Sequence, residues 1–205
     1  PKELPVIAYT KREDPRDALI LKPGIQDLKE GGIIGSSSRR RSLQAGKLYP
    51  KCNFKNIRGN VQTRLFKLEH EEYDATILAL AGLKRLGMEG LVSRIFSVDE
   101  MIPSAGQGIL AVQGRKGEKI PGIEAVDCSD SRFAAKAERG FVRYLNGGCT
   151  SPVAAYAQTS GNEIQIRGLY YHEETGQFEA GMISGEKHKG EILAERLARS
   201  LKGRF

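Results

Sequence analysis

The first half of the chain alternates short apolar runs with glycine-containing turns. Residues 73–80 are a near-continuous apolar segment, which is typical of a strand buried on both faces of a parallel sheet. Residues 33–37 form an apolar strand that runs into small residues. Further strands are predicted over residues 54–58 and, more briefly, over residues 6–9.

A helical pattern with basic residues in its first turns follows each of the longer strands. Ser38 or a neighbour can cap a helix that carries residues 39–41, and residues 61–70 place apolar side chains at helical spacing. Residues 81–85 open a further helix at Ala-Gly. This repeat of strand, glycine turn and basic helix start predicts an α/β fold with a doubly wound sheet, whose strand ends form one ligand crevice.

Two segments nearer the N-terminus also carry helical signals. Asp14 and Pro15 are the residue types of a cap and a first helical position, which predicts a helix over residues 16–19. A second short helical piece is expected to end at residues 28–30, just before a pair of glycines.

The last third of the chain has the pattern of a small α+β domain. An amphipathic helix is predicted over residues 131–145 and a terminal helix over residues 189–201. Between them, residues 153–159, 163–171 and 177–184 alternate apolar and polar positions as antiparallel strands do.

One more strand is predicted over residues 108–113, after an irregular stretch that contains Pro103. Together these patterns divide the chain into an anion-binding α/β domain over residues 1–104, a connecting segment over residues 105–127, and an α+β domain over residues 128–205.

Composition narrows the class of protein. The chain has 205 residues and 40% hydrophobic content, which is enough to bury substantial cores. No apolar run approaches the roughly 18 residues of a membrane span, and we expect a soluble, cytoplasmic protein with no membrane partner. The cysteines Cys52, Cys128 and Cys149 are widely spaced and histidines are few, so neither a disulfide framework nor a zinc site is predicted.

The formal net charge of +7 favours anionic partners. Nucleic acid is one candidate, but the basic residues lie in glycine-bounded turns, there is no tryptophan, and aromatic residues make up only 7%. A small ligand with several carboxylates explains the arginines at least as well. A binding-only solute module and a basic nucleic-acid-binding protein remain as alternatives on composition alone.

Residues 145–153, Leu-Asn-Gly-Gly-Cys-Thr-Ser-Pro-Val, place the Cys149 thiol in a loop where two glycines remove side-chain bulk. A lone cysteine is more often a small buried hydrophobe, but turn residues on both sides favour an exposed thiol. Arginines in residues 35–41, 58–64 and 81–85 can take carboxylates, because a guanidinium offers two parallel hydrogen bonds and keeps its charge. We therefore expect Cys149 to tether a polyanionic molecule that the arginines hold.

Six ordered motifs resemble the porphobilinogen deaminase (hydroxymethylbilane synthase) family of tetrapyrrole biosynthesis. They are residues 12–17, 35–41, 58–65, 73–87, 103–108 and 146–152. The resemblance implies that Cys149 carries a dipyrromethane cofactor through a thioether. It further implies cofactor-binding roles for Ser38, Arg40, Arg41, Arg58, Arg64, Arg85 and Gln107. Arg39 stands where the family has an apolar residue, so its side chain is expected to face solvent.

The resemblance also implies a periplasmic-binding-protein-like sheet domain and a transferase that joins four porphobilinogen molecules into hydroxymethylbilane for heme biosynthesis. The family's catalytic aspartate belongs to a segment before Pro1, so no catalytic residue is expected in this chain. We expect the 205 residues alone to be inactive, the N-terminal segment to be a required partner, and the complete enzyme to be a monomer. Residues 108–113 should return to a first domain that mostly precedes Pro1.

Overall fold

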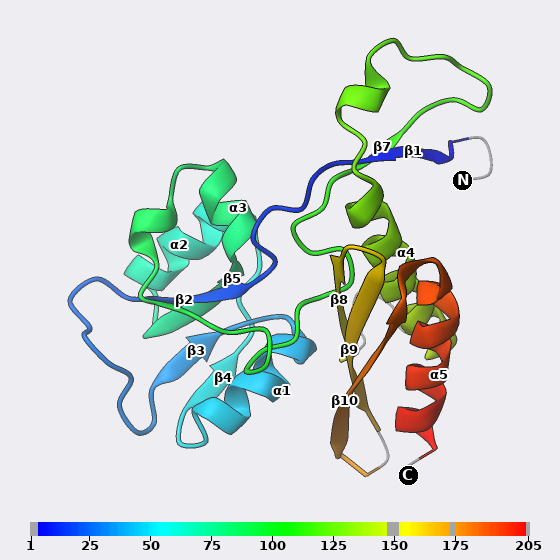
Figure 1. Cartoon of the computed structure of the whole chain (residues 1–205). Coiled ribbons are helices and arrows are strands. Elements are labelled where there is room, and N and C mark those ends of the chain that lie inside the picture. The colour runs from blue at the N-terminus through cyan, green and yellow to red at the C-terminus, as the bar shows by residue number, and fades with distance from the viewer. Residues whose placement is uncertain (1–3, 147–151, 173–174, 204–205) are drawn as a thin grey trace. The chain divides into compact units, whose positions relative to one another are not determined.

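The computed structural model describes residues 4–146, 152–172 and 175–203 (Figure 1). Contacts divide the chain into two compact units. One contains Asp14–Pro103 and is called here the five-stranded unit. The other contains Pro1–Glu13, Ser104–Gly147 and Val153–Phe205 and is called the discontinuous unit. The boundaries near residues 104 and 128 remain a sequence prediction. No helix in the described ranges is long and apolar enough to cross a membrane.

The five-stranded unit is built on a mixed sheet. Its strands are β2 (Asp17–Leu21), β3 (Ile33–Gly35), β4 (Asn53–Lys55), β5 (Ala75–Ala79) and β6 (Arg94–Ile95), in the order β4-β3-β5-β2-β6. Strand β3 runs parallel to β4 and β5, whereas β2 runs antiparallel to β5 and β6. The carboxyl ends of β3, β4 and β5 and the start of β2 therefore lie at one end of the sheet.

A helix begins shortly after each of the parallel strands, as the sequence predicts. These are α1 (Arg39–Leu48), α2 (Val61–His70) and α3 (Leu80–Arg85). Asn60 caps α2, where its side chain accepts the Thr63 N–H at 2.8 Å. Because each helix follows a carboxyl strand end, all three helix N-termini face the same end of the sheet. A 3₁₀ turn over Glu89–Leu91 follows α3.

Residues of β2 alternate between two apolar clusters. Ala18 and Ile20 pack with Leu68 of α2, while Leu19 packs with Ala45 of α1. Successive strand residues point to opposite faces of a sheet. Helices therefore cover both faces of this mixed sheet, and β5 is buried as its apolar run predicts.

Two helix predictions in this unit are wrong. Residues 17–19 belong to β2, in which four successive residues are buried between two layers. The side chain of Asp14 accepts the N–H of Arg16 at 3.1 Å, which makes a local turn rather than a helix cap. Residues 28–30 form no helix either. Burial of the Ala-Leu-Ile-Leu run by tertiary packing overrode the local cap signal.

In the discontinuous unit, β1 (Val6–Tyr9) pairs antiparallel with β7 (Ala111–Gln113). Both strands were predicted, although β7 is shorter than the predicted range of 108–113. Within the described residues the partner of β7 is thus a strand of this chain. A 3₁₀ turn over Ile123–Ala125 follows β7.

The same unit contains a three-stranded antiparallel sheet covered by two helices on one face (Figure 1). The helices are α4 (Ser129–Tyr144) and α5 (Gly190–Lys202), and the strands, in the order β10-β9-β8, are β8 (Ala154–Ser160), β9 (Glu163–Tyr171) and β10 (Phe178–Glu186). A 3₁₀ turn over Lys187–Lys189 precedes α5. These elements confirm the α+β pattern read from the sequence.

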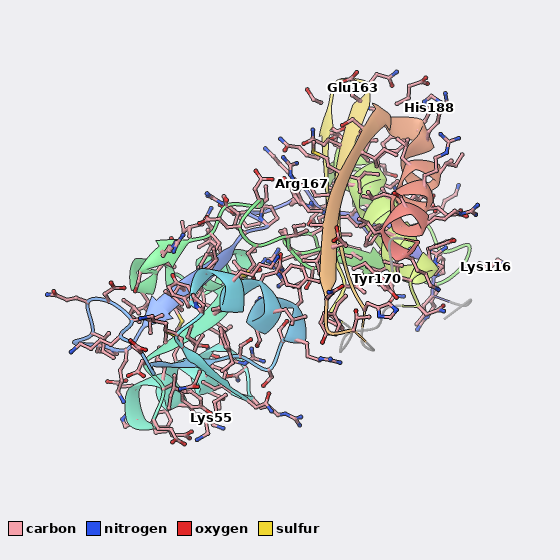
Figure 2. The ribbon with its side chains drawn as sticks, turned by 90° about the horizontal axis from the view of Figure 1, so that it is seen from below. Lys55, Lys116, Glu163, Arg167, Tyr170 and His188 are labelled. Carbon is pink, nitrogen blue, oxygen red and sulfur yellow. The ribbon has the colours of Figure 1, made fainter. Side chains whose placement is uncertain are left out.

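Figure 2 labels Glu163, Arg167 and Tyr170 along β9. Ile164 and Ile166, which alternate with Glu163 and Arg167, are buried in the cluster beneath α4 and α5, and Tyr170 packs against the same cluster. The alternation explains why the sequence alone identified this strand: one face meets the helices and the other carries polar side chains.

Candidate functional site

Three consecutive arginines open α1 at the end of the sheet where the helix N-termini gather. Strand β3 ends there at Gly35. A Cβ added to this glycine would lie 3.0 Å from the Tyr73 ring and 3.1 Å from Ile57, so there is little room for a side chain. Ser38 is the cap of α1, and its hydroxyl accepts the Arg41 N–H at 3.5 Å. Capping fixes the direction of the first turn, and with it the directions of the arginines.

The three arginines face different surroundings, because successive helical residues are spread around the axis. Arg39 is exposed, as expected. The side chain of Arg40 is 3% exposed and that of Arg41 12%. Arg40 and Arg41 are therefore the two arginines of this motif that turn into the unit.

Asp17, at the start of β2, lies between the two inward arginines and is fully buried. Its Oδ2 accepts from Nη1 of Arg40 at 2.6 Å. Its Oδ1 accepts from Nε of Arg41 at 2.9 Å and lies 2.8 Å from Arg41 Nη2. Backbone carbonyls bind the same arginines: Ile102 accepts from Arg40 at 2.9 Å and Ile77 from Arg41 at 3.2 Å.

Burial lowers the pKa of Arg40, and the carboxylate of Asp17 opposes that effect. One buried carboxylate thus balances two guanidinium groups, and the cluster of Asp17, Arg40 and Arg41 keeps a net positive charge. A buried cation is tolerated only with such a partner.

Arg64, in the first turns of α2, adds a further cation to this cluster. Its Nε donates to the carbonyl of Gly59 at 2.8 Å, and Gly59 has a φ of 125°, which favours glycine. Burial lowers the pKa of Arg64, and the nearby charge of Arg41 lowers it further. Within residues 14–103 the structure gives Arg64 no ion pair. Neighbouring guanidinium groups that outnumber the carboxylates beside them are suited to bind an anion.

Two further predicted site residues of this unit, Arg58 and Arg85, lie on its exposed surface. Arg58 is exposed and follows the end of β4 by three residues, so it lies in the loop to α2 rather than at the strand end. Arg85 is exposed on the last turn of α3. Gln107 belongs to the discontinuous unit, where its N–H donates to the Ser104 carbonyl at 3.0 Å. Cys149 lies outside the described residues.

Asp17 is the residue that sequence reasoning missed. It was included in a predicted helix because Asp14 and Pro15 resemble a helix start. The sequence did contain a signal for this role. Asp17 is an acidic residue directly before the apolar residues 18–21, and the same chain carries Arg40 and Arg41, for which binding roles were expected. Asp74 has a different place: it precedes β5 at the other end of the sheet, where its Oδ2 accepts the Ile33 N–H at 2.7 Å.

The other end of the sheet also holds a hollow of about 740 Å³, lined by residues 24–32 and Asp74. It includes none of the arginines described above. Among the described residues no group of histidine, cysteine and carboxylate side chains could hold a metal ion. The arginine cluster is therefore the candidate site that the chemistry favours.

Family comparison agrees with the motifs. The porphobilinogen deaminase, dipyromethane cofactor binding domain matches residues 1–120, and the porphobilinogen deaminase, C-terminal domain matches residues 132–203. The chain belongs to the porphobilinogen deaminase family. The first of these matches covers all the arginines of the site, and the second covers the α+β region that ends the chain.

Individual relatives share much of the sequence. The porphobilinogen deaminase of Ruminiclostridium josui is 50% identical over 200 residues, which are 98% of this chain and 68% of the relative. That of Ruminiclostridium cellulolyticum is 47% identical over 199 residues, 97% of this chain and 68% of the relative. That of Alkaliphilus oremlandii is 44% identical over 200 residues, 98% of this chain and 67% of the relative. The chain thus spans about two thirds of the length of these relatives.

Proposed function

We propose that this chain works as part of a transferase that deaminates porphobilinogen and joins four molecules of it into the linear tetrapyrrole hydroxymethylbilane. The primer in this proposal is a dipyrromethane bound through a thioether to Cys149. The observation that carries the proposal is that Arg41 lies near enough to Arg64 for its charge to lower the pKa of Arg64, in a cluster where two inward arginines share one carboxylate. Each pyrrole of the substrate brings carboxylate side chains that such a site can bind.

The residues of the arginine cluster fit a dipyrromethane. Arg41 and Arg64 would hold its carboxylates, with Arg40 behind them and Ser38 at the helix start. The N-terminus of α1 adds backbone N–H groups and a positive dipole end at the same place. When bound, the dipyrromethane supplies the free pyrrole to which each new pyrrole is joined. The family motifs are the only ground for three further proposed ligand contacts, which are Arg58, Arg85 and Gln107.

The chain's own contribution is binding and orientation. Guanidinium groups keep their charge at any working pH, so the site holds carboxylates without competing proton transfer. A growing chain kept at such a site makes each addition an intramolecular step, which lowers the entropic cost of reaction. Partly buried Arg64 also attracts an anion more strongly than an exposed arginine would, because solvent screens it less.

We assign no catalytic acid to the described residues. Asp17 is fully buried between Arg40 and Arg41. Asp14 is bound by the Arg16 guanidinium, which holds its pKa below the usual range. An acid that must exchange protons during turnover needs the opposite tuning, a pKa near the working pH. The catalytic carboxylate is proposed to be the aspartate that the family resemblance places before Pro1.

The proposal also includes the architecture of the five-stranded unit, the domain limits and the oligomeric state. The five-stranded unit is proposed to have the periplasmic-binding-protein-like architecture implied by the family resemblance, and mixed strand order with helices on both faces supports this. The boundaries near residues 104 and 128 are proposed as domain limits. The complete enzyme is proposed to act as a monomer.

Peptide mass mapping tests the tether directly. The complete enzyme, which includes these 205 residues, is incubated with porphobilinogen and digested. Its peptides are then searched for a dipyrromethane adduct. We expect the adduct on the peptide that contains Cys149 and not on those with Cys52 or Cys128, and Cys149→Ser should remove it. An adduct on another cysteine, or active enzyme without any adduct, would refute the assignment.

Porphobilinogen consumption by the isolated 205-residue chain tests the assignment of the acid. We expect no measurable turnover. Substantial turnover would mean that a carboxylate within this chain performs the proton transfers.

A further inference from the structure

Asp17 makes contacts of two kinds with the arginines. With Arg40 it forms an ion pair at 2.6 Å deep inside the unit, next to the carbonyl of Ile102. With Arg41 a single carboxylate oxygen meets both Nε and Nη2, at 2.9 and 2.8 Å. The Asp17 side chain has no exposed surface, so it cannot itself reach a ligand in the ordinary folded state.

These contacts determine the direction of the Arg41 guanidinium. Asp17 engages its Nε and Nη2, and the Ile77 carbonyl accepts from its Nη1 at 3.2 Å. A guanidinium has five N–H donors, so about two remain for an external anion. Because the other N–H groups are held by buried partners, the remaining ones have a defined direction before any ligand arrives.

The balance of charges in the cluster also indicates that Asp17 holds Arg41 in place. Without Asp17, Arg40 and Arg41 would both lose the carboxylate that they share, beside the further positive charge of Arg64. The charge of Arg41 already lowers the pKa of Arg64, which shows that the two groups interact. Arg41 has enough exposure to swing towards solvent and relieve that repulsion. A buried carboxylate that holds it in place lowers the cost of ordering the site on binding.

We propose that Asp17 is a positioning residue, which holds the Arg41 guanidinium beside Arg64 so that both are ready for a ligand carboxylate. This rests on the proposed function, because the ligand is the carboxylate-bearing pyrrole chain. Asp17 acts through Arg41 and touches no reacting atom.

Asp17→Asn is the first variant, because it keeps the shape and removes the charge. Glu138→Gln is the matched control, since Glu138 is an equally buried carboxylate paired with an arginine in the discontinuous unit. Should Asp17→Asn fail to fold, Arg40→Met is compared with the double variant Asp17→Asn/Arg40→Met. The double variant removes the more deeply buried of the two cations that lose the Asp17 carboxylate, so it keeps the comparison possible.

Two readouts are taken on each folded variant. The NMR signal of the Arg41 Nε–H, assigned by its loss in Arg41→Lys, reports on positioning without ligand. Titration with porphobilinogen reports on binding. In Asp17→Asn we expect the Nε–H to exchange with water at least about 10-fold faster and the affinity for porphobilinogen to fall by about 10-fold or more. Glu138→Gln should change neither quantity.

The proposal is overturned if folded Asp17→Asn keeps both the Nε–H exchange rate and the affinity, or if Glu138→Gln changes them equally. If Asp17→Asn does not fold, the proposal is likewise overturned when the Arg41 Nε–H exchanges at the same rate in Arg40→Met and in Asp17→Asn/Arg40→Met. An unmodified protein that binds no porphobilinogen would instead contradict the proposed function. The Nε–H signal of the ligand-free protein would still decide the role of Asp17, so the two failures can be told apart.

Discussion

Glu138 and Arg12 form a buried ion pair in which Oε1 of Glu138 lies 2.7 Å from Nη2 of Arg12. The same Oε1 accepts the Ala157 N–H at 2.7 Å, and Arg12 Nη1 donates to the Ala157 carbonyl at 3.2 Å. The second carboxylate oxygen accepts the Gly106 N–H at 2.6 Å. One ion pair therefore satisfies both backbone groups of Ala157 on β8 and connects α4 to two segments far away in sequence.

Arg12→Met is expected to lower the free energy of unfolding by about 3 to 5 kcal/mol, because it leaves the Glu138 carboxylate buried without its cation. Urea denaturation measures the loss. Arg12→Met/Glu138→Leu should recover only part of it, since the backbone groups of Ala157 remain without these partners. Lys51→Met, which breaks a pair with 72% and 74% exposed side chains, should change stability by less than about 1 kcal/mol. Equal losses for Arg12→Met and Lys51→Met would contradict the interpretation.

The loss in Arg12→Met should depend on pH. Burial raises the pKa of Glu138, and the charge of Arg12 opposes that rise. Without Arg12 the folded-state pKa rises further above the unfolded value of about 4.3. A raised carboxyl pKa destabilises the folded state as pH increases from the unfolded pKa through the folded pKa, and costs nothing below both. Stability of the variant relative to the unmodified protein should therefore improve towards acid pH, and a loss independent of pH would exclude this cause.

Arg64→Leu should weaken porphobilinogen binding by about 10-fold to 100-fold, the effect of losing one charge-assisted hydrogen bond. It should leave the melting temperature unchanged or raise it slightly, because Arg64 lies beside Arg41. Arg58→Leu should also impair cofactor assembly or chain extension. Arg139→Leu, on the exposed face of α4, is the control for loss of a positive charge. Unchanged turnover when both site variants are made in the complete enzyme would reject the anion site, whereas a collapse of stability would make these arginines structural.

Cys128 should be alkylated by iodoacetamide at lower pH than Cys52. Hydrogen bonds from Ser131 lower the pKa of Cys128, whereas burial and the charges of Asp74 and Asp27 raise that of Cys52. The thiolate is the reactive form, so a lower pKa moves the alkylation profile to lower pH. Ser131→Ala should move the Cys128 profile upwards, and peptide mass analysis distinguishes the two sites. Coincident profiles would contradict the prediction.

Gly168→Ala should destabilise the protein by about 1 to 3 kcal/mol, because the added Cβ would overlap the Phe141 ring in the core beneath α4. Gly82→Ala is the matched comparison: it lies in α3, where a Cβ meets nothing within 4 Å. It should be neutral or stabilising by up to about 1 kcal/mol, since alanine favours a helix. Thermal unfolding measures both changes, and similar effects for the two variants would show that close packing at Gly168 is not the cause.

Local chemistry made much of the fold readable from the sequence. Residues 61–70 form α2 because apolar residues recur at helical spacing behind the cap at Asn60. β9 was readable because Ile164 and Ile166 alternate with polar neighbours. Ser38, Arg40, Arg41 and Arg64 were named as site residues from their motifs, and the structure brings them to the same end of the sheet.

Asp17 and Glu138 could not be read in the same way. By sequence alone Asp17 belongs to a short stretch with helix-start residues, and Glu138 is one charged position on an amphipathic helix. Their roles depend on partners far along the chain: Asp17 meets arginines more than twenty residues away, and Glu138 meets Arg12 across 126 residues. Periodicity and caps are local properties of the chain, and the sequence by itself determined the elements and the residue types of the site. Only the tertiary structure decided which carboxylate balances which arginine, because burial and ion pairing are set by segments that fold together rather than by neighbours in sequence.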